Sequence, residues 1–175
     1  MPNFLQLPTR SKNGAVRVVV ETPRGSNVKL DYEPELGVFG LSRALALGVT
    51  YPHDWGFIPS TRAPDGDPLD AMVLFDGATY PGVVLECRPV GVVKIAEQKK
   101  TKTQRGRERN DRVILVPDRF PRFAHFKDIG DLSKPMKDEI QEFFATAVLF
   151  TDKSLTKLGW GNRAEAERII DRLAI

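Results

Sequence analysis

Three carboxylates fall within six residues in the segment Asp65-Gly66-Asp67-Pro68-Leu69-Asp70, just before an apolar stretch at residues 71–75. The glycine and proline in this segment predict a turn, where side chains can converge on one point instead of alternating between two faces of a strand. Carboxylate oxygens are the ligands that hard divalent cations such as Mg²⁺ prefer. The spacing therefore predicts a magnesium site at this turn.

Two other interpretations fit parts of the same pattern. Asp, Gly and Pro are also the usual residues of a surface β-turn without a ligand, so the hexapeptide needs support from the rest of the chain. A calcium-binding EF-hand loop requires Gly at its sixth position and Glu at its twelfth. This chain has Asp70 and Asp76 at those positions, which excludes the EF-hand.

Charged and phenolic side chains elsewhere suit the binding of an anionic substrate beside such a metal. Lys29 and Asp31 share the polar face of an expected strand, Arg43 ends another strand, and Tyr51 lies in a loop rich in Gly and Pro. Glu21 lies near the end of the first expected strand. Lys, Arg and Tyr donate hydrogen bonds to phosphate oxygens. Taken alone, Lys29 or Arg43 is more typical of a solvent-facing charge, and Tyr51 is more typical of core packing than of a ligand.

Most of the chain shows strand-like patterns. Strands are expected at residues 15–22, 28–33, 37–43, 71–75, 83–88, 90–95 and 113–116. In the second of these, period-two alternation is expected to turn Val28, Leu30 and Tyr32 to the core and the intervening charges to the other face. Short strands separated by Gly and Pro predict a small β-barrel.

The C-terminal third changes to a helical period. One apolar stripe begins just after Ser133 and Pro135, which are typical of a helix start, and consists of Met136, Ile140, Phe143, Phe144 and Ala147. A second helix is expected over Arg163–Leu173, with Asn162 as its N-cap. The expected fold class is α+β, a barrel with two C-terminal flanking helices.

Length and composition bound the possibilities further. A chain of 175 residues suits one domain spanning 1–175. The N-terminal residues lack the apolar core of a secretory signal, and no apolar run approaches the ~18 residues of a membrane span, so we expect a cytoplasmic protein without a membrane partner. Cys87 is the single cysteine and there are two histidines, so neither an internal disulfide nor a zinc-type spacing exists. Any metal is expected to be bound by oxygen.

The net charge of +3 originates in one segment. Between residues 97 and 112 the chain carries seven Lys and Arg against three acids. This pattern predicts a basic insertion loop at about residues 98–109 on a nearly neutral body. The loop has no interleaved aromatic residues for base stacking, which disfavours nucleic acid as a partner.

Taken in order, these pieces resemble the soluble family I inorganic pyrophosphatases. The aspartate turn matches the D-x-D-P-x-D metal signature of that family, and the resemblance covers about residues 16–172. Further matches are Val20-Glu21-Thr22-Pro23, Lys29, Arg43, Tyr51-Pro52, Gly56-Phe57-Ile58, Pro81-Gly82, Cys87 to Val92, His125 to Asp128 and Gly159-Trp160. The resemblance implies a five-stranded OB-like barrel and, for bacterial members of this length, a hexamer.

The resemblance also implies Mg²⁺-dependent hydrolysis of inorganic pyrophosphate to two phosphates, with several ions per site. Asp67 would accept the proton of the attacking water, and Tyr51 is counted with it among the catalytic groups. The remaining roles are implied as phosphate binding for Lys29, Arg43, Tyr51 and Arg112, metal binding for Asp65, Asp70, Glu97 and Asn110, and support for Glu21 and Asp31.

Departures from the family pattern fall on this site. Glu97 stands where the family usually has an aspartate, and Asn110 replaces another aspartate, so one metal ligand loses its charge. Arg112 replaces a lysine, and Asp31 replaces a glutamate. Asp111 could supply the missing carboxylate only if a bulge turned it to the same face as Asn110.

Donors are also missing elsewhere. The family's Tyr-Lys pair on the first C-terminal helix is replaced by Ala147 and Val148, and Trp55 stands where tyrosine is usual. Two hypotheses stay open. The first is a working pyrophosphatase whose basic loop, Lys99 to Arg109, supplies the missing positive charge. The second is a degenerate relative that binds polyphosphate, nucleotide or nucleic acid through that loop, or that hydrolyses an organic diphosphate.

Overall fold

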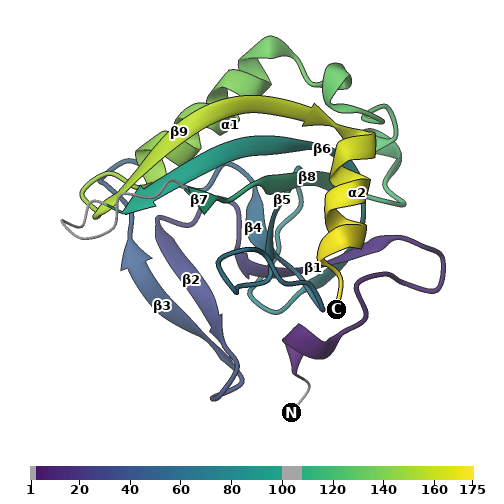
Figure 1. The fold of residues 1–175 in the computed structure, drawn as a ribbon, viewed down its shortest axis with the longest axis horizontal. Coiled ribbons are helices and arrows are strands. Elements are labelled where there is room, and N and C mark those ends of the chain that lie inside the picture. The colour runs from purple at the N-terminus through teal and green to yellow at the C-terminus, as the bar shows by residue number, and fades with distance from the viewer. Residues whose placement is uncertain (1–2, 100–107) are drawn as a thin grey trace.

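A computed structural model describes residues 3–99 and 108–175. Nine strands and two α-helices follow one another in these residues (Figure 1). The strands are β1 (Val16–Thr22), β2 (Val28–Glu33), β3 (Val38–Ala44), β4 (Asp54–Ile58), β5 (Leu69–Val73), β6 (Val84–Lys99), β7 (Glu108–Arg109), β8 (Arg112–Pro117) and β9 (Lys153–Asn162). The helices are α1 (Lys134–Ala147) and α2 (Arg163–Leu173), and short 3-10 turns occur at Phe4–Gln6, Pro121–Phe123 and Ile129–Asp131.

Five strands close into a ring. β1 pairs with β4, β4 with β5, β5 with β8, β8 with β6, and β6 returns to β1. Only the β5–β8 pairing in this ring is parallel. Closure leaves none of these strands with a fully open edge, which is how small barrels satisfy their backbone groups. The expected five-stranded, OB-like α+β fold is confirmed.

The segment predicted as two strands, 83–88 and 90–95, is a single long strand, β6. Its register with β8 shifts between Pro89 and Gly91, as at a β-bulge. A bulge leaves one residue out of the hydrogen-bond ladder, so a strand can accommodate a proline there although proline has no N–H to donate. Beyond the ring, β6 continues to Lys99 and pairs with β9 over its whole outer half.

The sequence prediction missed β4, β9 and the two-residue β7, which lies at the end of the segment expected to be a loop. All five residues of β4 are buried, so its sequence has no alternation to reveal it. β9 is largely exposed or half-buried and also lacks a period-two pattern. β5 begins at Leu69, two residues before the strand expected at 71–75, so Asp70 belongs to the strand and not to the turn.

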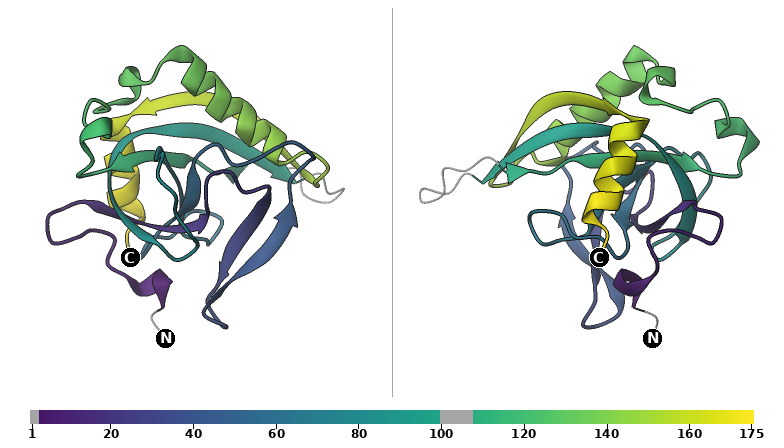
Figure 2. Two further views of the ribbon diagram at one scale, coloured as in Figure 1. Left: turned by 180° about the vertical axis from the view of Figure 1, so that it is seen from behind. Right: turned by 45° about the vertical axis from the view of Figure 1, so that its right-hand side comes forward.

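A separate hairpin, β2–β3, projects from the ring (Figure 2). Its predicted apolar face is buried only in part, which corrects the expectation for this strand. Tyr32 is buried against Phe4, Phe39 and Phe57, whereas Val28 and Leu30 are half-buried. Tyr32, near the turn of the hairpin, is covered because these aromatic rings pack around it, and Val28 and Leu30 are not part of this cluster.

Both helices lie as predicted. Ser133 caps α1 by accepting a hydrogen bond from the Met136 N–H, and α1 buries Ile140, Phe143, Phe144 and Ala147. Asn162 caps α2 by accepting from the Glu165 N–H at 3.0 Å. α2 packs Ala166, Ile169 and Ile170 against the apolar interior formed by the ring strands.

Two further expectations concern the whole chain. The centre of the predicted basic insertion at about 98–109, residues 100–107, lies outside the described residues. None of the helices in the described residues has the length and apolar character that a membrane crossing requires.

Cys87 is a free thiol buried in the barrel, and burial raises its pKa above the ordinary value.

Candidate active site

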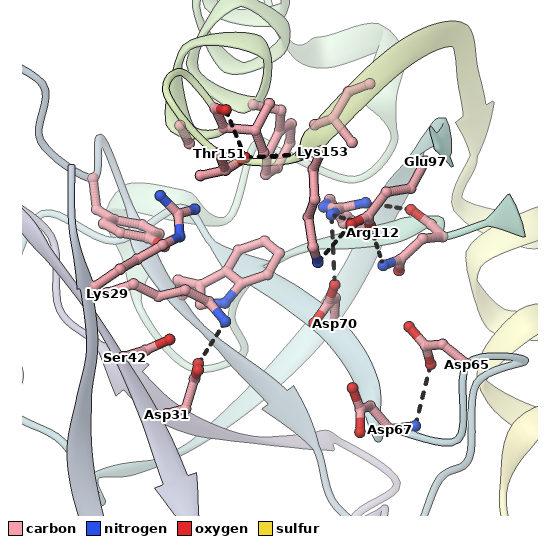
Figure 3. A pocket seen from close by; sticks show the side chains of 18 of the residues that line it. Lys29, Asp31, Ser42, Asp65, Asp67, Asp70, Glu97, Arg112, Thr151 and Lys153 are labelled. Carbon is pink, nitrogen blue, oxygen red and sulfur yellow. Dashed lines mark hydrogen bonds and ion pairs between the residues drawn. The ribbon is translucent and has the colours of Figure 1, made fainter. Parts of the chain in front are cut away.

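A cavity of about 430 Å³ opens between the β2–β3 hairpin, the turn before β5 and the segment that joins α1 to β9 (Figure 3). All the side chains predicted to act at the site, except Glu21, line it. Those lining residues are Lys29, Asp31, Arg43, Tyr51, Asp65, Asp67, Asp70, Glu97, Asn110 and Arg112. Their roles remain predictions, but the fold brings residues as far apart in the sequence as Lys29 and Arg112 to one cavity.

Glu21 lies beside this cavity and not in it. It lines an adjoining cavity of about 300 Å³, whose wall also includes Lys29, Asp31, Asp67 and Asp70. Its Oε1 accepts a hydrogen bond from the Tyr32 N–H at 2.8 Å. Burial raises the pKa of Glu21 to about 7, against the effect of this hydrogen bond. The position suits a supporting group one layer behind the main cavity.

The aspartate turn is held by its own backbone. The Asp67 N–H donates to Oδ1 of Asp65 at 3.2 Å, and the Ala63 N–H donates to the Asp67 carbonyl at 2.8 Å. Gly66 has a φ of +93°, which a residue with a Cβ rarely adopts. Asp65 and Asp67 are exposed, and Figure 3 shows both carboxylates below Asp70 on the same side of the cavity. The turn therefore presents the carboxylates of Asp65 and Asp67 to the same cavity as Asp70 at the start of β5.

Asp70 and Arg112 occupy the inner part of the cavity. Nη2 of Arg112 lies 3.9 Å from Oδ2 of Asp70 and also 3.9 Å from Oε2 of Glu97. The guanidinium packs over the rings of Trp55, at 5.7 Å, and Phe144, at 5.2 Å. Burial raises the pKa of Asp70 to about 6, although the charge of Arg112 acts in the opposite direction. Arg112 thus balances two carboxylates from a buried position.

Glu97 is surrounded by donors. Nδ2 of Asn110 lies 3.1 Å from its Oε2, and Nζ of Lys153 lies 2.6 Å from its Oε1. Burial favours the protonated form, but the hydrogen bonds from Lys153 and Asn110 and the charges of Lys153 and Arg112 together lower the pKa of Glu97. Glu97 is therefore an ionised carboxylate at neutral pH.

Asp111 does not replace the carboxylate that Asn110 lacks. Its Oδ1 accepts hydrogen bonds from Arg109 Nε at 2.7 Å and from the Ile95 N–H at 3.3 Å, and its side chain is not part of the cavity wall. The alternative that depended on a bulge at this position is therefore not supported.

The cationic side of the cavity comes from the hairpin. Lys29 and Arg43 are cross-strand partners, and Nζ of Lys29 lies 2.5 Å from Oδ1 of Asp31. Tyr51 is 3% exposed, and its ring packs against that of Phe143 with the centroids 4.9 Å apart and the planes tilted by 59°. Burial raises the pKa of Tyr51 above its ordinary value, so its hydroxyl stays protonated and can donate a hydrogen bond.

Sequence reasoning missed four polar lining residues: Ser42, Thr151, Asp152 and Lys153. Thr151 and Asp152 lie in the connection between α1 and β9, and Lys153 is the first residue of β9, where no strand was expected. No pattern in the sequence marks this connection as part of the site. Lys153 is the one among them that carries a positive charge.

The donor set fits magnesium. Six carboxylates line the cavity against four cations, so the cavity has an excess of negative charge that divalent ions would neutralise. Within the described residues, no three His, Cys, Asp or Glu side chains are grouped closely enough to hold one ion. Mg²⁺ commonly uses only one or two carboxylates and keeps several waters, so the spread arrangement is compatible with it.

Comparison with known proteins gives one consistent result. The model of a family described as inorganic pyrophosphatase matches residues 18–174. An inorganic pyrophosphatase of Thermus thermophilus is 40% identical over 170 residues, covering 95% of this chain and 93% of its own. One of Nostoc is 35% identical over 167 residues, covering 95% of this chain and 94% of its own.

Solved structures agree with the sequence comparisons. The crystal structure of inorganic pyrophosphatase from Thermus thermophilus superposes with a TM-score of 0.89 at 38% identity, covering 98% of this chain and 97% of that chain. An inorganic pyrophosphatase from Helicobacter pylori gives a TM-score of 0.85 at 31% identity, covering 95% of each chain.

Proposed function

The chain belongs to the inorganic pyrophosphatase family, and on this premise we propose that it hydrolyses inorganic pyrophosphate to two phosphates in the 430 Å³ cavity. One observation carries the proposal: the carboxylates of the aspartate turn face Lys29, Arg43 and Tyr51 across a single cavity. Carboxylates on one side suit metal ions, and donors on the other suit phosphate oxygens.

Magnesium fits the carboxylate side. Asp65 and Asp70 would hold the ions, with Glu97 and Asn110 as further oxygen ligands on the adjoining wall, on the other side of Arg112 from Asp70. When bound, the ions would lower the pKa of a water and neutralise charge on the phosphate oxygens. Asn110 carries no charge, so the ionised Glu97 next to it has to supply the negative charge on this wall.

The side chains have distinct tasks in this proposal. Asp67 lies on the exposed tip of the turn, close enough to Asp65 to share the same space, and would accept the proton of the attacking water. Lys29, Arg43 and the protonated hydroxyl of Tyr51 would hold the phosphates by hydrogen bonds. Arg112 would keep Asp70 and Glu97 in place and reach the phosphate with the rest of its guanidinium.

A further part of the proposal concerns the whole protein. The resemblance supports a homo-oligomer, a hexamer in bacterial members of this length, and a cytoplasmic enzyme with the basic insertion at about 98–109 inside a single domain, 1–175. Sedimentation velocity would test the assembly. A monomer at micromolar concentration would contradict it.

Phosphate release from pyrophosphate tests the proposed reaction. The wild-type protein should release two phosphates per pyrophosphate in Mg²⁺ and none in excess EDTA. Absence of release under both conditions would contradict hydrolysis and favour the alternative of a protein that binds polyphosphate, nucleotide or nucleic acid. Release from an organic diphosphate but not from pyrophosphate would instead identify a changed substrate.

A further inference from the structure

Lys153 is the first residue of β9, and its side chain enters the cavity from the side of α1. Figure 3 shows it extending down from the α1–β9 segment until its nitrogen lies between Glu97 and Asp70. β9 is held in this place by its pairing with β6, in which Lys153 is the partner of Lys99 and Leu155 the partner of Glu97. The ammonium is therefore delivered by a sheet pairing and not by a free surface loop.

The wall beside Lys153 has few groups that could bind phosphate. Phe144, Ala147, Val148 and Leu155 present apolar side chains to the cavity. The hydroxyl of Thr151 donates to the Val148 carbonyl at 2.7 Å and so is already used. Among the described residues that line this side of the cavity, Lys153 is the one cation.

Glu97, the ion-pair partner of Lys153, also interacts with two other side chains. Glu97 also accepts from Asn110 at 3.1 Å and lies 3.9 Å from Arg112. The Lys153 side chain is 45% exposed, whereas those of Glu97 and Arg112 are 12% and 9% exposed. An exposed lysine can leave a carboxylate at small cost, because water solvates its ammonium. A divalent cation bound at Glu97 would displace Lys153 before it displaced Arg112.

We propose that Lys153 is a phosphate-binding residue, held by Glu97 when the site is empty and turned to a phosphate when a metal ion takes its place at Glu97. The inference rests on the proposed function. It means that Lys153, at the start of β9, supplies positive charge beside the positions of Ala147 and Val148, at the C-terminal end of α1.

Calorimetric titration with inorganic phosphate in the presence of Mg²⁺ tests this inference. Lys153→Gln should weaken phosphate binding by about tenfold or more, the usual effect of losing a charge-assisted hydrogen bond. Lys153→Arg should restore part of the affinity. Lys157→Gln is a matched control on the same strand, because Lys157 pairs with Glu142 and is not part of the cavity wall. It should bind phosphate as the wild type does.

Titration with Mg²⁺ alone separates this role from a merely structural one. Removing Lys153 takes a competing cation from Glu97, so Lys153→Gln should bind Mg²⁺ as tightly as the wild type or more tightly. If Lys153→Gln bound Mg²⁺ more weakly, and this accounted for its loss of phosphate binding, the inference would be overturned. It would also be overturned if Lys153→Gln bound phosphate as tightly as Lys157→Gln does. Wild-type protein that binds phosphate through Lys153 without hydrolysing pyrophosphate would refute the proposed function alone.

Discussion

Lys29 and Arg43 are paired directly across the β2–β3 hairpin, so two cationic side chains stand next to each other at the cavity. Like charges on paired residues of neighbouring strands repel and destabilise the hairpin. Asp31 compensates Lys29 at 2.5 Å. Within residues 3–99 and 108–175, no carboxylate forms an ion pair with Arg43. The pair is a site that an anion would stabilise.

Replacing Arg43 separates binding from stability. Arg43→Gln should raise KM for pyrophosphate by about tenfold or more, because a charged hydrogen bond to phosphate is lost. The thermal midpoint of the substrate-free protein should not fall, because a repulsion with Lys29 is removed as well. Arg119→Gln, at an exposed position outside the cavity, is the control for both measurements. An unchanged KM would contradict the role of Arg43.

Arg112 is predicted to stabilise the protein most strongly when metal is absent. It is 7% exposed and lies between Asp70 and Glu97, so Arg112→Met leaves two carboxylates without their shared cation. Unfolding in EDTA should show a loss of about 3 kcal/mol, and Mg²⁺ should recover part of it. Arg109→Met removes an exposed ion pair with Asp111 and should cost less than ~1 kcal/mol. Equal losses in both variants would argue against a buried balancing role.

Glu21 gives a dependence on pH. Its pKa of about 7 in the folded protein lies above the ordinary value of 4.5. Below pH 4.5 the carboxyl is neutral in both the folded and the unfolded state, and its burial costs no stability for ionisation. As pH rises through 7 the unfolded state is charged more easily than the folded one, so stability is lost. Glu21→Gln keeps an oxygen for the Tyr32 N–H and removes the charge. In EDTA at pH 8 the variant should be more stable by about 1–3 kcal/mol, and the difference should vanish near pH 4. Urea unfolding across this range would refute the assignment if the difference were constant.

Gly66 links backbone conformation to activity. Its φ of +93° makes Gly66→Ala strained, although an added Cβ would meet no atom within 4 Å. Gly14 has a φ of +83° and equally open surroundings, so Gly14→Ala is a control with the same strain outside the cavity. Both variants should lose about 1–2 kcal/mol of stability. Only Gly66→Ala should lower kcat, because it shifts Asp65 and Asp67. Equal kcat in both would show that the turn need not be held in this conformation.

The elements that the sequence revealed are those with a regular period or a local signal. α2 could be predicted to the residue because Asn162 caps it and its apolar face repeats at helical spacing. β4 could not, because it is buried on both faces, and the β6 bulge at Pro89 divided one strand into two apparent ones. The order of strands around the ring depends on pairings between distant segments, which no local pattern records.

The site residues also differ in whether the sequence alone could reveal them. Asp65, Asp67 and Asp70 lie within one short segment, so their meeting could be expected from the turn residues alone. Resemblance to a family supplied Lys29, Arg43 and Tyr51, which local patterns alone would have left as surface charges or core. Lys153 had neither a motif nor a strand pattern, and it reaches Glu97 only because β9 pairs with β6. The partner of Asp111, Arg109, could likewise be identified only from the structure.

The kcat of Asp67→Asn in saturating Mg²⁺ and pyrophosphate tests the central claim most directly. Asparagine has the same size but cannot accept the proton of the attacking water, so kcat should fall by about 100-fold or more while KM changes little. Asp138→Asn, an exposed aspartate on α1 paired with Lys134, should retain the wild-type kcat. An Asp67→Asn variant with a kcat within about threefold of the wild type would contradict the claim that this turn performs the proton transfer.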